Sequence, residues 1–272
     1  MQEAELTAAT RIEAGRSYGF FTDTTVCIGC KACEVACKNW NGVGVDGLEW
    51  SGNSYDNTGD LGAQTWRHVA FVEQNKALWH GQTQRWLMMS DVCKHCTRAG
   101  CFDACPTGAI IRTEFDTIVV QSDVCNGCGY CVMACPYGVI ELDLGGSGLA
   151  QKCTLCYDRL RGGLEPACAK ACPTDSIQFG PLDALVERAV DRTVALRHQG
   201  IEDAYLWGLD EHQAGGLNAF FLLVDEPEVY NLPRSGTDPA DFVAESAWRT
   251  TVAALLLGLF TILNFLRAGH DA

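Results

Sequence analysis

Positive charge is scarce in this sequence, and so are the short motifs that mark nucleotide or haem sites. Lys and Arg number 20 against 34 Asp and Glu, so the formal net charge is −14. A chain this acidic offers no basic stripe for phosphates, and no nucleic-acid partner is expected. There is no GxxxxGK[S/T] loop, no GxGxxG that follows a strand and opens a helix, and no CxxCH for covalent haem. The sequence therefore predicts no catalytic site of its own.

The amino terminus also lacks the features of an export signal. MQEAELTAATRIEAG, residues 1–15, carries charges, no apolar stretch and no twin-arginine pair. Disulfide frameworks belong mostly to short exported chains that cannot build a core, whereas 272 residues suffice for one or two domains. The 16 cysteines are therefore expected to bind metal rather than to form disulfides.

The cysteines fall into four groups of four, and none is left over. Each group ends in Cys-x-x-x-Cys, which is followed by proline in three groups and by Lys38 in the first. This is the spacing of bacterial ferredoxins, in which three cysteines hold one cubane and the fourth is expected to begin a short helix toward another cluster. The groups are CIGCKACEVAC (Cys27, Cys30, Cys33, Cys37), CKHCTRAGCFDACP (Cys93, Cys96, Cys101, Cys105), CNGCGYCVMACP (Cys125, Cys128, Cys131, Cys135) and CTLCYDRLRGGLEPACAKACP (Cys153, Cys156, Cys168, Cys172).

A structural zinc protein is the remote alternative, since two CxxC pairs suffice for a four-thiolate zinc site. Zinc needs neither a third cysteine two residues further on nor a repeated Cys-Pro ending, so [4Fe-4S] clusters are favoured. A cubane with four thiolate ligands has no vacant position for substrate, which favours electron transfer over catalysis. Six basic side chains beside or near the ligands are candidates for raising cluster potentials: Lys31, Lys38, Lys94, His95, Arg98 and Lys152.

Spacing favours a nested pairing of the groups. The second and third are separated by 109–124, which is typical of two strands around a turn at 114–116. The first and fourth groups then pair outside this unit, and sequential pairing, first with second and third with fourth, is the alternative. Nesting predicts four ligand sets: set A (Cys27, Cys30, Cys33, Cys172), set B (Cys37, Cys153, Cys156, Cys168), set C (Cys93, Cys96, Cys101, Cys135) and set D (Cys105, Cys125, Cys128, Cys131).

The predicted fold class is α+β, with two ferredoxin-like two-cluster units in a pseudo-symmetric arrangement and a single C-terminal transmembrane helix. Paired strands are expected at 66–74 and 83–90, and a hairpin at 204–209 and 219–224. A helix over 181–198 would bury Leu182, Leu185, Val186, Ala189 and Val190. The expected segments are 19–40 with 150–180 as the first unit, 41–90 as an insertion with a surface loop at 41–65, 91–149 as the second unit, 181–242 as helix, hairpin and extended interface arm, and 247–267 as the transmembrane helix.

The carboxyl terminus carries the one long apolar run. TTVAALLLGLFTILNFL, residues 250–266, contains no charge and lies between Arg249 and Arg267. Starting from Ala247, with Arg249 extending toward water, the run suffices for a hydrocarbon core of roughly 30 Å. A buried core helix is the alternative, and one arginine at each end leaves the orientation open.

Four stretches of the sequence resemble the iron–sulfur (beta) subunits of respiratory formate dehydrogenases. They are GFFTDTTVCIGCKACEVACKNWN, DVCKHCTRAGCFDACPTGAI, VCNGCGYCVMACPYGVI and QKCTLCYDRL with PACAKACPTDSIQFG. The resemblance covers about residues 19–180 closely, and EPEVYNLP and the C-terminal helix extend it. The wider group includes beta subunits of nitrate, dimethyl sulfoxide and polysulfide reductases and partners of some hydrogenases, so the same role in one of these is the alternative function.

The resemblance implies an electron path of four [4Fe-4S] clusters. Electrons would pass from a molybdopterin or tungstopterin catalytic (alpha) subunit to a membrane cytochrome b (gamma) subunit and quinone. Set A would face the catalytic subunit, and sets C and D would lie nearer the lipid bilayer. Members of this type lie on the outer (periplasmic) face of the membrane and are exported with a signal-bearing partner, and a cytoplasmic complex is the alternative.

Overall fold

A four-stranded sheet lies at the centre of the fold. The computed structural model describes residues 12–45, 50, 52, 56–75, 84–236 and 243–270. The sheet has the order β8-β1-β10-β9 and is built from β1 (Tyr18–Asp23), β8 (Ile177–Pro181), β9 (Tyr205–Trp207) and β10 (Ala219–Leu223). β1 runs antiparallel to β8 and parallel to β10. The antiparallel β9–β10 pair confirms the hairpin that the sequence predicts, whereas the parallel β1–β10 pairing was not expected.

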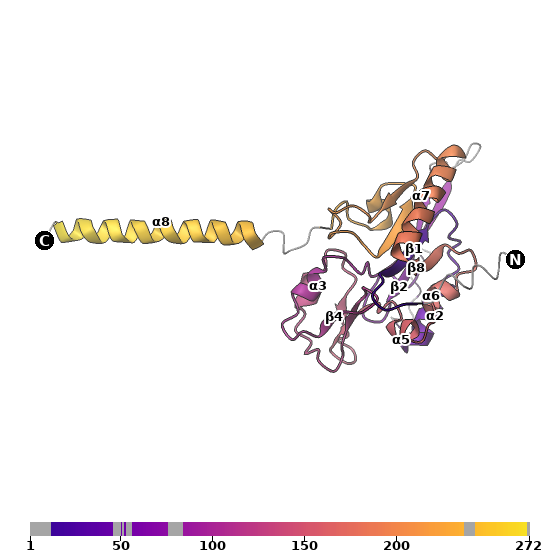
Figure 1. The fold of residues 1–272 in the computed structure, drawn as a ribbon, viewed down its shortest axis with the longest axis horizontal. Coiled ribbons are helices and arrows are strands. Elements are labelled where there is room, and N and C mark those ends of the chain that lie inside the picture. The colour runs from indigo at the N-terminus through magenta and orange to yellow at the C-terminus, as the bar shows by residue number, and fades with distance from the viewer. Residues whose placement is uncertain are drawn as a thin grey trace.

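Helix α7 (Leu182–His198) packs against β1, β8 and β9 of this sheet (Figure 1). The residues that it packs into the core are Leu182, Leu185, Val186, Ala189, Thr193 and Leu196. Val190, which was expected on the buried face, is 46% exposed, so that expectation was wrong. The apolar stripe continues through Thr193 and Leu196 instead, and Val190 lies on the solvent side of it.

Three two-stranded ribbons complete the strand structure of the described residues. They are β2 (Arg67–Gln74) with β3 (Arg85–Val92), β4 (Ile110–Arg112) with β5 (Ile118–Val120), and β6 (Glu141–Leu142) with β7 (Ala150–Gln151). All three are antiparallel. The first two confirm the predicted strand pairs, including the turn at 114–116, where Asp116 has a left-handed φ of 60°.

A short helix carries the third cysteine of each group. These helices are α2 (Ala32–Asn41), α3 (Gly100–Asp103), α4 (Tyr130–Met133), and, after α5 (Tyr157–Arg161), α6 (Ala167–Lys170). The third cysteine of every group is the second residue of its helix: Cys33, Cys101, Cys131 and Cys168. The fourth was expected to begin a helix, which was wrong: in three groups it follows the helix end, because the proline after it cannot continue a helix. Lys38 replaces that proline in the first group, and α2 accordingly runs through Cys37.

The last part of the 181–242 segment, after the hairpin, was expected to be an extended arm, and it folds back at its start instead. Pro227–Tyr230 forms a short 3-10 helix, and Tyr230 and Leu232 are buried in the core of the four-stranded sheet. Residues 237–242 lie outside the described part of the chain, as do 1–11 of the amino terminus and 46–49, 51, 53–55 and 76–83 of the expected insertion.

Helix α8 (Val243–His270) projects from the rest of the fold at the carboxyl terminus (Figure 1). Within it, Glu245–Phe265 is long and apolar enough to cross a membrane, with a mean hydropathy of 1.5. None of that stretch is buried against the described residues, so α8 is not a core helix of this protein.

Candidate metal centres

Sheet pairing brings the cysteine groups together in a nested way. β1 ends shortly before Cys27 and β8 begins shortly after Cys172, and their antiparallel register places Thr22 opposite Ile177. β4 follows Cys105 and β5 precedes Cys125, and their register places Ile110 opposite Val120. Each of these two strand pairs therefore joins the strand beside one cysteine group to the strand beside its nested partner group.

Three hollows in the described residues are each lined by four cysteines. In every hollow three cysteines come from one group and the fourth comes from the nested partner group. The first holds Cys27, Cys30, Cys33 and Cys172, the second Cys93, Cys96, Cys101 and Cys135, and the third Cys105, Cys125, Cys128 and Cys131. These are the members of sets A, C and D.

The members of set B also lie together. Helix α2, which carries Cys37, packs against α6, which carries Cys168. Burial, reinforced by the negative charge of nearby thiolates at Cys168 and Cys156, raises the pKa of Cys37 to about 12. Cys153 lies within electrostatic range of the other three thiols. The Asn41 amide links two of them, since Nδ2 lies 3.6 Å from Cys37 Sγ and also hydrogen-bonds Cys156.

The donor sets fit four-iron clusters better than single ions. Sets A, C and D each offer four thiols around one hollow, which is the ligand set of a [4Fe-4S] cubane. Within the described ranges, no three Cys, His, Asp or Glu side chains come close enough to ligate one metal ion, as a structural zinc site requires.

A left-handed residue shapes the loop of every group. The residue before the second cysteine has a positive φ in each: Gly29 (64°), His95 (46°), Gly127 (70°) and Leu155 (55°). This conformation costs a residue with a Cβ about 1 kcal/mol or more, so two groups accept strain to keep the loop. One benefit is visible at Leu155, whose backbone N–H donates to Cys153 Sγ at 3.3 Å.

Neighbouring sets lie within electrostatic range of one another in the order A, B, C, D. Cys33 of set A lies within electrostatic range of Cys168 of set B, and Cys153 of set B within range of Cys93 of set C. The pKa of Cys101 in set C is in turn affected by Cys131 of set D. The two end sets each contain an exposed cysteine, Cys30 in set A and Cys128 in set D. The arrangement is a path with both ends at the surface.

Buried basic groups flank set C. His95 lines the hollow of set C, and its Nδ1 accepts a hydrogen bond from the Ile118 N–H at 3.0 Å. The proton of the neutral ring is therefore on Nε2, which has no hydrogen-bond partner among the described residues. Burial, with the positive charge of Lys152, holds the pKa of His95 well below its usual value. Lys152 is fully buried and donates to the Ile118 and Cys153 carbonyls, the latter at 2.9 Å. Both residues can therefore stabilise negative charge in set C.

The other basic residues singled out in the sequence are mostly committed to protein partners. Lys94 pairs with Asp91, and Lys31 pairs with Asp56 at 2.6 Å. Lys38 donates to the Thr65 hydroxyl at 2.9 Å and to the Gln64 carbonyl, while Arg98 lines none of the three hollows.

Arg67 is the basic residue that sequence reasoning missed. It lies in β2, far from any cysteine in sequence, yet it is buried in electrostatic range of Cys168 and Cys33. Burial alone would lower its pKa, but the surrounding thiolates raise it above its usual value. The sequence offered little signal for it, because the strand RHVAFVEQ also carries His68 and Glu73 and nothing in its pattern marks Arg67 as buried.

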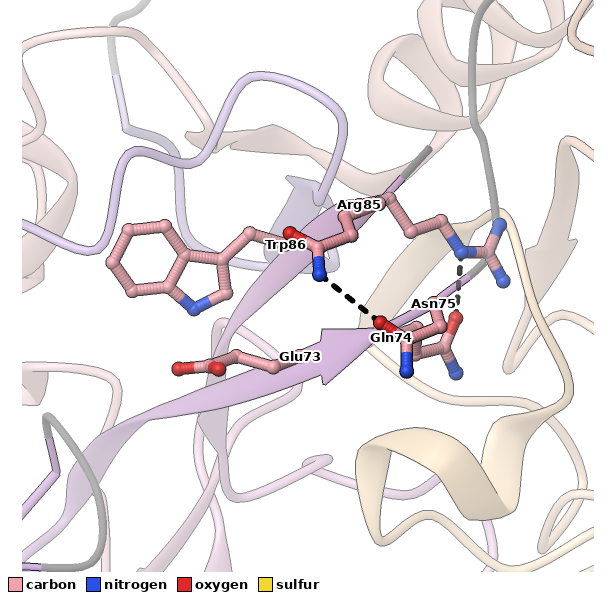
Figure 2. A pocket seen from close by; sticks show the side chains of 6 residues that line it. Glu73, Gln74, Asn75, Arg85 and Trp86 are labelled. Atoms are coloured by element: carbon pink, nitrogen blue, oxygen red, sulfur yellow. Dashed lines mark hydrogen bonds between the residues drawn. The ribbon is translucent and has the colours of Figure 1, made fainter. Parts of the chain in front are cut away.

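One wide hollow lies away from the cysteines, at the end of the β2–β3 ribbon (Figure 2), with a volume of about 470 Å³. Figure 2 shows Glu73 and Trp86 on one side of the ribbon and Gln74 with Arg85 on the other, as their register pairs require. Arg85 Nε donates to Gln74 Oε1 at 2.6 Å, and its guanidinium pairs with Asp225. Its charge is thus used to hold the ribbon to the core, and the hollow adds no metal ligand.

Cys105 is expected to be alkylated before Cys37 when iron is removed from the protein. Although its slight burial opposes ionisation, the Thr107 hydroxyl and nearby backbone N–H groups lower the pKa of Cys105, whereas that of Cys37 is raised to about 12. Thiolate is the reactive form, so raising the pH from about 8 to about 10 should speed the labelling of Cys37 roughly 100-fold and that of Cys105 less than tenfold. Mass spectrometry of iodoacetamide-labelled protein measures both rates. The same increase in labelling rate for Cys37 and Cys105 between the two pH values would contradict the local environments described above.

Two matches to a 4Fe-4S dicluster domain cover residues 26–109 and 84–182. Their overlap contains the second cysteine group, so the matches do not decide which groups pair. The protein is 38% identical to the formate dehydrogenase iron-sulfur subunit of Haemophilus influenzae over 261 residues, which is 92% of this sequence and 80% of that protein.

Two further relatives separate the candidate functions. The formate dehydrogenase-O iron-sulfur subunit of Escherichia coli is 40% identical over 217 residues, 77% of this sequence and 68% of its own. A polypeptide of the anaerobic dimethyl sulfoxide reductase of Escherichia coli is 35% identical over 174 residues, which is 64% of this sequence. The higher identity over the longer stretch is with the formate dehydrogenase proteins. The protein belongs to the family of formate dehydrogenase iron–sulfur subunits, electron-transfer proteins built from 4Fe-4S dicluster domains.

Proposed function

We propose that this protein carries four [4Fe-4S] clusters in a formate dehydrogenase complex and conducts electrons from the catalytic subunit to a membrane partner. The observation that carries the proposal is the division of 16 cysteines into four sets of four, each set in electrostatic range of the next. Each cluster supplies one-electron transfer. The protein supplies the thiolates, the spacing between sets and the surrounding charge.

The ligands of the four clusters are the members of sets A, B, C and D. In this assignment, 19–40 with 150–180 form one two-cluster unit and 91–149 form the other. The packing of α2 on α6 in the first unit and of α3 on α4 in the second supports a pseudo-symmetric relation between them. In this assignment 41–90 is an insertion between the units, and 181–242 follows them in the sequence.

The ends of the path suggest where partners bind. Beside set A, Ile28 and Val35 are 57% and 67% exposed, and beside set D, Tyr130 and Met133 are 60% and 87% exposed. Exposed apolar side chains next to an exposed ligand suit subunit interfaces, where a second redox centre comes close. We place the molybdopterin or tungstopterin catalytic subunit at set A and a cytochrome b subunit at set D.

Helix α8 is the membrane anchor in this proposal. Its apolar stretch of 21 residues is about 31 Å long at 1.5 Å per residue, close to the roughly 30 Å of a hydrocarbon core. The soluble part is assigned to the outer face of the membrane, as the family resemblance implies.

Purification through a tag on this protein tests the proposed function. We expect a catalytic subunit and a membrane subunit to co-purify with formate–quinone activity, and roughly 16 irons per molecule of this subunit. Interacting cubane signals in the electron paramagnetic resonance (EPR) spectrum of the reduced complex are expected as well. Zinc without iron, or activity with dimethyl sulfoxide in place of formate, would contradict the proposal.

A further inference from the structure

Arg67 lies in the interior, at the junction of sets A and B. Only 1% of its surface is exposed. The thiols within its electrostatic range include Cys33 of set A and Cys168, Cys153 and Cys37 of set B. Two other buried cations near the path have different positions. Lys152 acts on Cys93, Cys101 and Cys153 at the junction of sets B and C, and Lys94, which pairs with Asp91, acts on Cys96 and Cys135 of set C.

The contacts of Arg67 orient its guanidinium and leave one edge of it free. Nη1 donates to the Ser90 hydroxyl at 3.0 Å and the Ser90 carbonyl at 3.3 Å. The Ser90 Oγ in turn lies 3.3 Å from Cys33 Sγ. The ring of Phe20 lies against the guanidinium, 4.7 Å from Cζ to its centroid. Nε and Nη2 have no hydrogen-bond partner within the part of the protein that the structure describes.

A buried guanidinium with two unpaired nitrogen donors is costly unless negative charge compensates it. Such charge is what a cubane with four thiolate ligands brings, and each reduction adds one further negative charge. The sulfur atoms of a cluster also accept N–H hydrogen bonds, which tune its potential. The unpaired donors of Arg67 are thus explained if they face the negative charge of a bound cluster.

We propose that Arg67 is a potential-setting residue, which raises the midpoint potentials of the clusters in sets A and B by holding a fixed positive charge and two free N–H donor groups between them. The proposal rests on the ligand sets of the proposed function. Arg67 then supplies one positive charge to both sets, so that an electron is stabilised on the cluster of set A and, after transfer, on the cluster of set B.

Redox titration of the purified complex, followed by EPR, tests this role. In Arg67→Met we expect the midpoints of both clusters to fall, so that at the wild-type midpoint the reduced-to-oxidised ratio drops at least tenfold, which corresponds to about 59 mV for one electron. Arg67→Lys keeps the charge but loses the planar fork, and a smaller fall is expected. Lys170→Met is the matched control: Lys170 lies on α6 between Cys168 and Cys172, but its side chain is 73% exposed, and its loss should leave the midpoints unchanged.

Midpoints equal to those of the wild type in either Arg67 variant would overturn the proposal. If Arg67→Met does not assemble, Arg67→Lys decides, because a fall in both midpoints supports the role and unchanged midpoints refute it. A wild-type complex without iron or cubane signals would instead refute the proposed function. Clusters that are present but unmoved in potential refute only the role of Arg67.

Discussion

Cys135→Ala is expected to remove the cluster of Cys93, Cys96 and Cys101, and with it all formate-to-quinone electron transfer. Cys135 belongs by sequence to the group of Cys125, yet its side chain lines the hollow of set C. Set C lies between sets B and D in the path, so its loss separates the catalytic end from the membrane end. The measurement is iron content, expected to fall by about four atoms per molecule, together with the EPR signals of the remaining clusters.

Cys131→Ala is the matched control, since Cys131 lies in the same motif, within helix α4, whereas Cys135 follows the end of that helix. Its side chain lines the hollow of set D, so this variant should lose the other cluster of the unit. Cys135→Ala should therefore lose the EPR signal of the set C cluster, and Cys131→Ala that of the set D cluster. Loss of the Cys125 cluster in Cys135→Ala would contradict the nested pairing and favour a closed tetrad within one motif.

The sequence predicts the nested pairing because two different signals agree. The cysteine spacing requires a partner for each fourth ligand, and the short segment between Cys105 and Cys125 holds one hairpin. What remained open was whether the first group pairs with the fourth. The antiparallel register of β1 and β8 brings these groups together, and that contact depends on strands that are far apart in the sequence.

The parts that sequence reasoning missed have physical reasons. The parallel pairing of β1 with β10 is a long-range contact between two apolar strands, and either could have paired elsewhere. His95 and Leu155 adopt the left-handed backbone that glycine adopts at the same position of the other two groups, because the loop between the cysteines determines the conformation. Arg67 escaped notice because its partner charge comes from side chains remote in sequence.

Helix α8 gives the second large effect: Leu255→Arg is expected to release this protein from the membrane. Leu255 lies at the middle of the apolar stretch and is 68% exposed, with nothing in the described residues packed over that stretch. An arginine at the centre of a bilayer costs roughly 2.5–3.5 kcal/mol on insertion scales, which is about two orders of magnitude in partitioning. The measurement is the share of this protein in the membrane fraction after an alkaline carbonate wash.

Ala247→Arg tests whether the effect of an added charge depends on its depth in the membrane, as a membrane-spanning helix requires. Ala247 lies near the end of the stretch, beside Arg249, where a long side chain can extend to the water interface. It should therefore keep the protein in the membrane fraction, with the same added charge as Leu255→Arg. Because α8 is not buried by the described residues, neither change should disturb the cysteine sets, and iron content should stay constant in both variants. Equal retention of the two variants would show that depth in the bilayer does not matter, and the anchor would then have to lie in contacts with a partner subunit.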